Sequence, residues 1–172
     1  KSVFYKCSNL KKISFAPEIR IESIEDHSFA KCESLDQIEI PSSVKFIGCS
    51  SFYKCISLSK IILPSSVTTI KKNTFAKCSK LSMISIPSSV EKIERSAFYN
   101  CSSLVNINIP SSLISIDNFA FYGCSSLTIL EILSPHPTID EYAFSNCSSL
   151  IKKDNAISSI IDEDIVDKLE FS

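Results

Sequence analysis

The sequence predicts an α/β, β-rich solenoid in which short repeats stack and lay their strands side by side in a single-layer parallel sheet. The first observation is a fixed period, because Cys recurs every 23 residues with a Phe three residues before it. The second is a stretch of apolar and polar alternation that ends at Pro in successive units. The third is size, since a 23-residue unit cannot bury its own apolar side chains and must stack on its neighbours to do so. The period is marked by Cys32, Cys55, Cys78, Cys101, Cys124 and Cys147.

Each unit contains a predicted strand, a turn, a second extended piece and a compact turn, in that order. Residues 81–86 alternate and are rich in β-branched side chains, which is typical of a strand. Pro87 cannot donate to a ladder, so it ends the strand and, with two serines, begins a turn. Residues 67–70 are a second short extended piece, and residues 94–101 have the apolar spacing of about one helical or 3₁₀ turn.

The repeats divide the chain into two parts. Residues 1–150 hold six complete units of 23–25 residues and an N-terminal partial unit that ends at Cys7. The first complete unit carries two extra residues within 16–22, which we expect in a loop. Residues 151–172 break the strand pattern and predict a terminal capping segment, helical from Ser158 or Ser159, with acidic residues in its first turn. The partial first unit leads us to expect a chain that begins inside a longer array.

The unit resembles the BspA-like, or treponemal-type, leucine-rich repeat, whose pattern is close to L-x-x-I-x-I-P-x-x-V-x-x-I-x-x-x-A-F-x-x-C. The resemblance covers about residues 4–150 and is carried by Pro after the strand and by A-F-x-x-C before the next Leu. It implies a curved leucine-rich-repeat solenoid with a concave parallel sheet. It also implies a place on surface proteins of bacteria or parasitic protists, where such arrays are associated with adhesion to host matrix or cells.

The cysteines predict a buried thiol ladder rather than disulfides. Stacked column members lie about 5 Å apart with parallel side chains, which is poor disulfide geometry. Cys49 lies outside the column, and we expect it to be the most exposed thiol. The cysteines are never spaced as C-x-x-C, and His27 and His136 have no ligand-spaced partner, so we expect no metal and no cofactor.

No catalytic constellation is present, and we expect a protein that is not an enzyme. The paired serines recur with the turn geometry, and no base is placed beside them. The chain has only two glycines, which leaves no phosphate-binding loop. It also has no apolar run of about 18 residues, so we expect no membrane insertion by this segment.

The strand residues that the repeat leaves free are the candidate ligand-binding set. They point outward from the concave sheet and vary from copy to copy while the buried positions stay apolar. Variation on a rigid frame is what a recognition surface requires, and neutral drift at solvated sites is the alternative. The set comprises Lys12, Ser14, Gln37, Glu39, Lys60, Ile62, Met83, Ser85, Asn106, Asn108, Ile129 and Glu131.

Charge is distributed unevenly along the chain. Residues 1–86 carry 13 basic and 7 acidic side chains, and residues 87–172 carry 5 and 12. Lys31, Lys54 and Lys77 share one repeat position and predict a lysine stripe. Such a stripe is either simply solvated or neutralised by an anionic partner, of which a sulfated or sialylated glycan fits better than nucleic acid.

Together these features predict a non-enzymatic protein-binding module, and the resemblance implies that it is part of a cell-surface or secreted adhesin. Its partner would be a host extracellular-matrix or cell-surface protein, with an anionic glycan as a further possible ligand and no role for nucleic acid. The alternative is a cytoplasmic protein–protein interaction scaffold that uses the same face. A purely structural spacer within a longer surface protein is the third reading.

Overall fold

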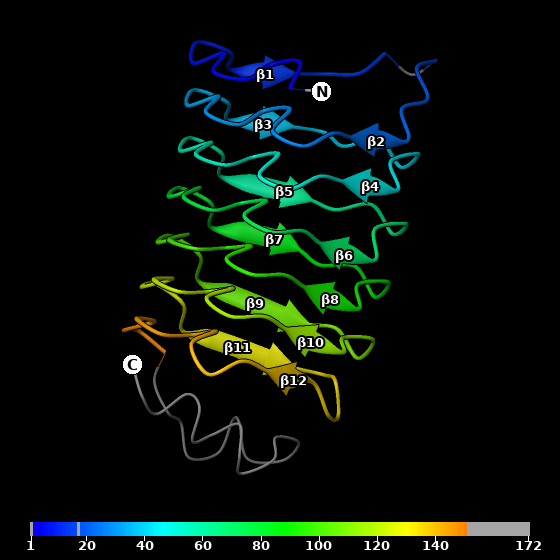
Figure 1. Ribbon diagram of the computed structural model, residues 1–172. Helices are drawn as coiled ribbons and strands as arrows, with labels where there is room; N and C mark the ends of the chain where they lie inside the picture. The colour runs from blue at the N-terminus through cyan, green and yellow to red at the C-terminus, as the bar shows by residue number, and fades with distance from the viewer. Residues whose placement is uncertain (1, 17, 151–172) are drawn as a thin grey trace.

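The computed structural model describes residues 2–16 and 18–150, and each repeat in it forms one turn of a parallel β-solenoid. The turns stack from the N-terminal end to the last described repeat, with two columns of short strands running down the stack (Figure 1). This architecture confirms the leucine-rich-repeat solenoid predicted from the sequence. The capping segment predicted for 151–172 lies outside the described residues.

The first strand column is formed by the L-x-x-I-x-I segments. Its strands pair in parallel, with Lys12 opposite Gln37, Lys60 opposite Met83 and Asn106 opposite Ile129. Alternate side chains therefore fall into straight columns, one set buried and the next exposed. The strands are β1 (Lys12–Ile13), β3 (Gln37–Ile38), β5 (Lys60–Ile62), β7 (Met83–Ser85), β9 (Asn106–Ile109) and β11 (Ile129–Ile132).

The second column is formed by the V-x-x-I segments, which pair in parallel in the same way. Partners in this column are 23 residues apart throughout, whereas Lys12 and Gln37 in the first column are 25 apart. The two extra residues of the first unit therefore lie between β1 and β2, as predicted. The strands are β2 (Ser23–Ile24), β4 (Phe46–Ile47), β6 (Thr69–Ile70), β8 (Lys92–Ile93), β10 (Ser115–Ile116) and β12 (Thr138–Ile139).

A ladder of Phe rings runs through the core. Phe52, Phe75, Phe98 and Phe121 are fully buried, and consecutive rings stack nearly parallel with centroids 5.0–5.5 Å apart. The Leu, Ile and Val of each repeat surround this ladder and form one continuous cluster. Apolar burial shared between adjacent repeats, rather than within a repeat, holds the solenoid together.

The F-x-x-C segments form hydrogen-bonded turns, and no helix occurs among residues 2–16 and 18–150. In the turn before Cys55, the Tyr53 and Cys55 amides donate to carbonyls three residues back, while the Phe52 and Lys54 amides donate to the next repeat. This alternation requires a left-handed residue in each turn, and Lys54 has φ of 60°. Backbone hydrogen bonds between repeats therefore take the place of the hydrogen bonds that a helical or 3₁₀ turn would form within the segment.

The repeated serines have a structural role. Ser66 Oγ donates to the Val44 carbonyl of the preceding repeat at 2.5 Å, and Ser89 Oγ donates to the Val67 carbonyl at 2.7 Å. Each hydroxyl thus satisfies a carbonyl at a turn, where strand pairing has ended. The P-S-S-V motif therefore recurs because every repeat needs the same hydrogen bond.

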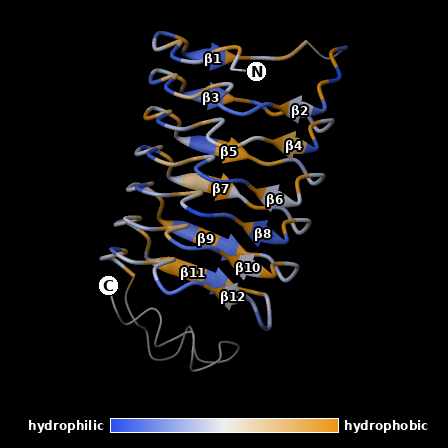
Figure 2. Ribbon diagram, viewed as in Figure 1, coloured by the Kyte–Doolittle hydropathy of each residue, from blue (hydrophilic) through white to orange (hydrophobic). Residues whose placement is uncertain are grey.

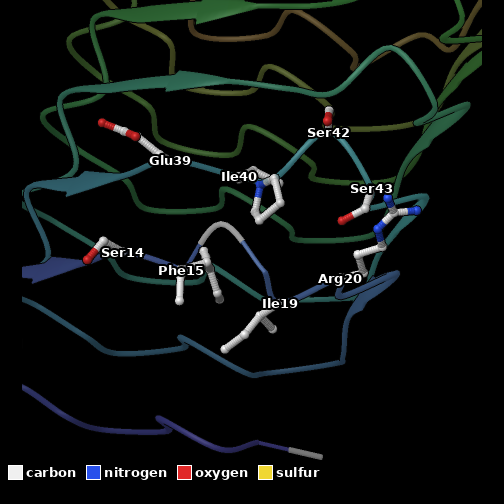
Figure 3. Close-up of a pocket in the computed structure, with 10 residues that line it drawn as sticks. Ser14, Phe15, Ile19, Arg20, Glu39, Ile40, Ser42 and Ser43 are labelled. Carbon is white, nitrogen blue, oxygen red and sulfur yellow. The ribbon is translucent and has the colours of Figure 1, made fainter.

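Beside the two-residue insertion lies a hollow of about 610 Å³. Phe15 and Ile19 of the loop line it together with Ile40 of the next repeat, and Arg20 and Ser43 lie at its other end (Figure 3). The hollow therefore lies between the loop of the first complete repeat and the repeat that follows it.

Candidate functional site

The outward side of the first strand column, which we call the concave face, carries all twelve predicted ligand-binding residues. Every one of them is solvent-exposed: Lys12, Ser14, Gln37, Glu39, Lys60, Ile62, Met83, Ser85, Asn106, Asn108, Ile129 and Glu131. The strand register brings them into two parallel columns. One begins at Lys12 and the other at Ser14. Their role in binding remains a prediction.

Three of the twelve predicted residues on the concave face are exposed apolar side chains among polar ones. Ile62 is 58% exposed, and Met83 and Ile129 are each 55% exposed. Ile62 and Met83 lie on the paired strands β5 and β7. In Figure 2 the start of β11 is hydrophobic and β9 beside it is hydrophilic. The face thus offers apolar contacts framed by groups that can form hydrogen bonds, the usual composition of a recognition surface.

The predicted lysine stripe lies at the turn edge of the solenoid, away from the strand columns. Lys31, Lys54 and Lys77 occupy the left-handed position of their turns, with φ of 60–64°. Their side chains are half-buried, and none forms an ion pair with a residue that the structure describes. The lysines that do form ion pairs across repeats lie elsewhere: Lys45 with Glu22, Lys71 with Glu94 and Lys92 with Asp117.

Tyrosines accompany the lysine stripe. The ammonium groups of Lys6 and Lys31 lie 5.4 and 5.9 Å from the centre of the Tyr5 ring, and that of Lys54 lies 5.8 Å from the centre of Tyr53. These are cation–π distances. Sequence reasoning overlooked these tyrosines. The signal was the residue after each core Phe, which reads Tyr5, Ala30, Tyr53, Ala76 and Tyr99.

The same residues line a hollow of about 470 Å³, which we call the tyrosine groove. Tyr5, Tyr53 and Tyr99 line the groove from alternate repeats. The repeats between them carry Ala30 and Ala76 at the same position, and both alanines are buried. Lys31 and Lys77 line the groove from one position of the repeat. A second, polar position of the repeat contributes His27, Ser50, Asn73 and Ser96.

The cysteine column is sealed from solvent from Cys32 onward. Each buried thiol donates to the carbonyl of the Phe one repeat before, as Cys78 does to Phe52 at 3.1 Å. Burial raises the pKa of Cys78 to about 12 from an ordinary value of 9.0, and burial also raises the pKa of Cys101 well above that ordinary value. These thiols are therefore neutral and unreactive at physiological pH. All eight cysteines are free, and Cys7, not Cys49, is the most exposed.

The described residues offer no assembled reaction centre. His27 and His136 are exposed and lie in different repeats, and the turn serines donate to backbone carbonyls. Residues 2–16 and 18–150 contain no cluster of three metal-ligating side chains. Over the same residues, no helix is long and apolar enough to cross a membrane.

A regular stack of parallel turns with a varied exposed face defines a solenoid scaffold of the leucine-rich-repeat type. The model of the BspA type leucine rich repeat region matches six copies in this chain, over residues 1–94 and 80–162. The chain therefore belongs to the BspA-type leucine-rich-repeat family. This repeat class points to a protein-binding module.

Solved structures agree with this assignment. A leucine-rich repeat protein of T. pallidum is 28% identical, with a TM-score of 0.83 over 98% of this chain and 74% of that one. A leucine-rich repeat protein from Bacteroides ovatus is also 28% identical, with a TM-score of 0.71 over 83% of this chain and 39% of its own. One from Eubacterium ventriosum, at 18% identity and a TM-score of 0.61, shares the fold over 77% of this chain and 42% of its own. No curated protein matches the chain.

Proposed function

We propose that this chain is a non-enzymatic protein-binding module of a cell-surface adhesin and that it contacts host matrix or cell-surface proteins through the concave face. The observation that carries the proposal is the contrast between a constant frame and a varied face. Phe, Leu and Cys repeat at buried positions along the stack, whereas the column that begins at Lys12 reads Lys, Gln, Lys, Met, Asn and Ile and so mixes basic, polar and apolar side chains.

Burial of the exposed apolar side chains would supply most of the binding free energy of the proposed contact. Burial of apolar surface contributes about 25 cal/mol per Å², so a large aliphatic side chain that becomes covered contributes about 1.5–3 kcal/mol. Ile62 and Met83 lie diagonally across the paired strands β5 and β7, because Met83 is opposite Lys60 and Ile62 is opposite Ser85. Both are mostly exposed and within reach of one partner surface, which fits the centre of an interface. Lys60, Ser85 and Asn106 around them would then form the polar rim.

The proposal is tested with the double variant Ile62→Glu, Met83→Glu, measured against purified extracellular-matrix proteins and fixed host cells. We expect at least a tenfold loss of affinity, because two carboxylates would replace the apolar centre. The matched control is Ile114→Glu, since Ile114 is 63% exposed but lies outside the concave face. Equal binding by wild type and the double variant would reject the concave face as the contact surface.

The second candidate function, an intracellular interaction scaffold, is favoured by the eight free cysteines, because reducing compartments keep thiols free. Burial weakens this argument, since a neutral thiol sealed in the core also survives oxidation outside the cell. Antibody labelling of the native protein on intact and on permeabilised cells separates the two. Labelling of intact cells supports the adhesin, and labelling only after permeabilisation supports the scaffold.

A further inference from the structure

We propose that the tyrosine groove and its lysine stripe form a second binding site, for a linear sulfated polysaccharide, on a surface separate from the concave face. The proposal goes beyond a protein-binding role, and it stands whether or not the concave face binds a protein. It rests on three observations: the backbone conformation of the lysines, the alternation of tyrosine and alanine, and the unpaired positive charge.

The lysines occupy a position that local backbone energetics disfavours. Lys6, Lys31, Lys54 and Lys77 all have φ near 60°, a region that suits Gly and Asn far better than a long side chain. The later repeats place Asn100, Gly123 and Asn146 there instead. Four consecutive lysines at a strained position therefore point to a use for the charge, because strain of this kind gathers at functional sites.

The aromatic alternation runs from Tyr5 to Tyr99 and so extends one repeat beyond the last lysine, to the repeat in which Asn100 takes the lysine position. Tyr5, Tyr53 and Tyr99 line the groove on alternate repeats, and the next repeat breaks the alternation with Tyr122, which stacks on Tyr99 at 4.9 Å. At about 4.8 Å per repeat, tyrosines on alternate repeats recur about every 10 Å. A groove with this regular period suits a linear polymer that lies along the stack, rather than a compact small molecule.

The density of charge favours a sulfated polymer. The lysines recur at every repeat, so one cation follows another about every 4.8 Å along the edge. A polysaccharide with one carboxylate on every second sugar has only about half as many charges per unit length as this row of lysines. A sulfated polysaccharide has an anion on every sugar and therefore matches the row. Glu33 is the one described acidic residue among those lining the hollows on either side of the stripe, and it is exposed. The cations are therefore largely free to meet an external anion.

The tyrosine faces argue against single-stranded nucleic acid as the occupant. Bases bind such surfaces by stacking on open aromatic faces. Here Lys6 and Lys31 lie over Tyr5, Lys54 lies over Tyr53, and Tyr122 covers Tyr99. The rings hold the ammonium groups in place through cation–π contacts. Sugar hydroxyls can instead bond to the partly exposed polar side chains of Asn73 and Ser96, which line the groove.

The test uses a fluorescent heparin decasaccharide and the double variant Lys54→Gly, Lys77→Gly. The charge-matched control is Lys12→Ser, Lys60→Ser, which removes the same charge from the concave face. We expect the glycine variant to bind heparin roughly tenfold more weakly, and its affinity to depend less on salt, with a log–log slope reduced by about two. The control is expected to change affinity less than about twofold. Gly123 already stands at this turn position, so the glycine variant should fold.

The tyrosines are tested separately with Tyr53→Ala, because loss of the ring removes the support for Lys54. The control is Tyr142→Ala, which removes an exposed tyrosine outside the groove. Weaker heparin binding by the first variant alone supports the proposal.

Unchanged heparin binding by the glycine variant, or an equal loss in the serine control, would overturn the proposal. So would tighter binding of oligo-dT or polyglutamate than of heparin, since the occupant would then be a nucleic acid or an acidic protein segment. The Ile62→Glu, Met83→Glu variant is expected to bind heparin like wild type. A failure of the concave-face function is therefore distinguishable from a failure of this site.

Discussion

Truncation of one ring in the Phe ladder tests the packing account most sharply. Phe98 is fully buried and lies between Phe75 and Phe121, with ring centroids 5.4 and 5.0 Å away. A core Phe→Ala change costs about 3–5 kcal/mol. Both stacking neighbours of Phe98 lose their partner, and aromatic pairs contribute about 0.5–1.5 kcal/mol beyond burial. We therefore expect Phe98→Ala to lower the free energy of unfolding by about 4–5 kcal/mol.

The assay is urea unfolding followed by far-ultraviolet circular dichroism, with the midpoint and slope measured separately. The control is Asn106→Ala, which removes an exposed amide from β9 and should cost under about 0.5 kcal/mol. A smaller slope in Phe98→Ala would mean that the stack no longer unfolds as one unit. A loss below about 1 kcal/mol, or one equal to that of Asn106→Ala, would refute the assignment of Phe98 to a tightly packed core.

Three further predictions concern the turn and the thiols. Lys54→Gly should raise the free energy of unfolding by up to about 1 kcal/mol, since Gly accepts φ of 60° without strain; a loss of stability in thermal unfolding would contradict the strain argument. Ellman titration of the native protein should detect only Cys7 and Cys49 and reach all eight thiols in urea; rapid labelling of Cys78 in the native state would show that the column is open. The free energy of unfolding should fall as pH rises above 9.0, by about 1.4 kcal/mol per pH unit for each buried thiol such as Cys78. The cause is that the thiol ionises in the unfolded chain above pH 9.0, whereas in the folded chain it stays neutral until about pH 12. Equal unfolding midpoints at pH 8 and pH 10 would refute this.

Most of the stack could be predicted from the sequence because the same pattern of buried residues and turn residues recurs in each repeat. Phe, Cys and Leu at a fixed period define the core, and Pro64 marks where a strand must end. The strand alternation also separates exposed from buried residues, so the pattern alone predicts that Ile62 and Met83 are exposed, as the structure shows.

The turn edge could not be predicted in the same way. Spacing in F-x-x-C fits a helical turn and a β-turn equally well, and the choice depends on hydrogen bonds to the next repeat, such as that from the Lys54 amide to Ala76. The left-handed conformation of the lysines follows from those bonds. Asn100, Gly123 and Asn146 at the same position favour that conformation, but the four lysines of the earlier repeats hide the signal. The tyrosine groove was visible only as an alternation after the core Phe, which has no meaning until the turns are stacked.

Oxidation of Met83 provides the most direct measurement of the concave-face claim. Met83 is the sole methionine of the chain, is 55% exposed and lies at the centre of that face. Mild peroxide converts an accessible methionine to its sulfoxide, and mass spectrometry follows the single site. The account predicts that a bound matrix protein slows Met83 oxidation at least tenfold, whereas heparin leaves it unchanged. Equal oxidation rates for the free chain and its complex with the matrix protein would contradict it.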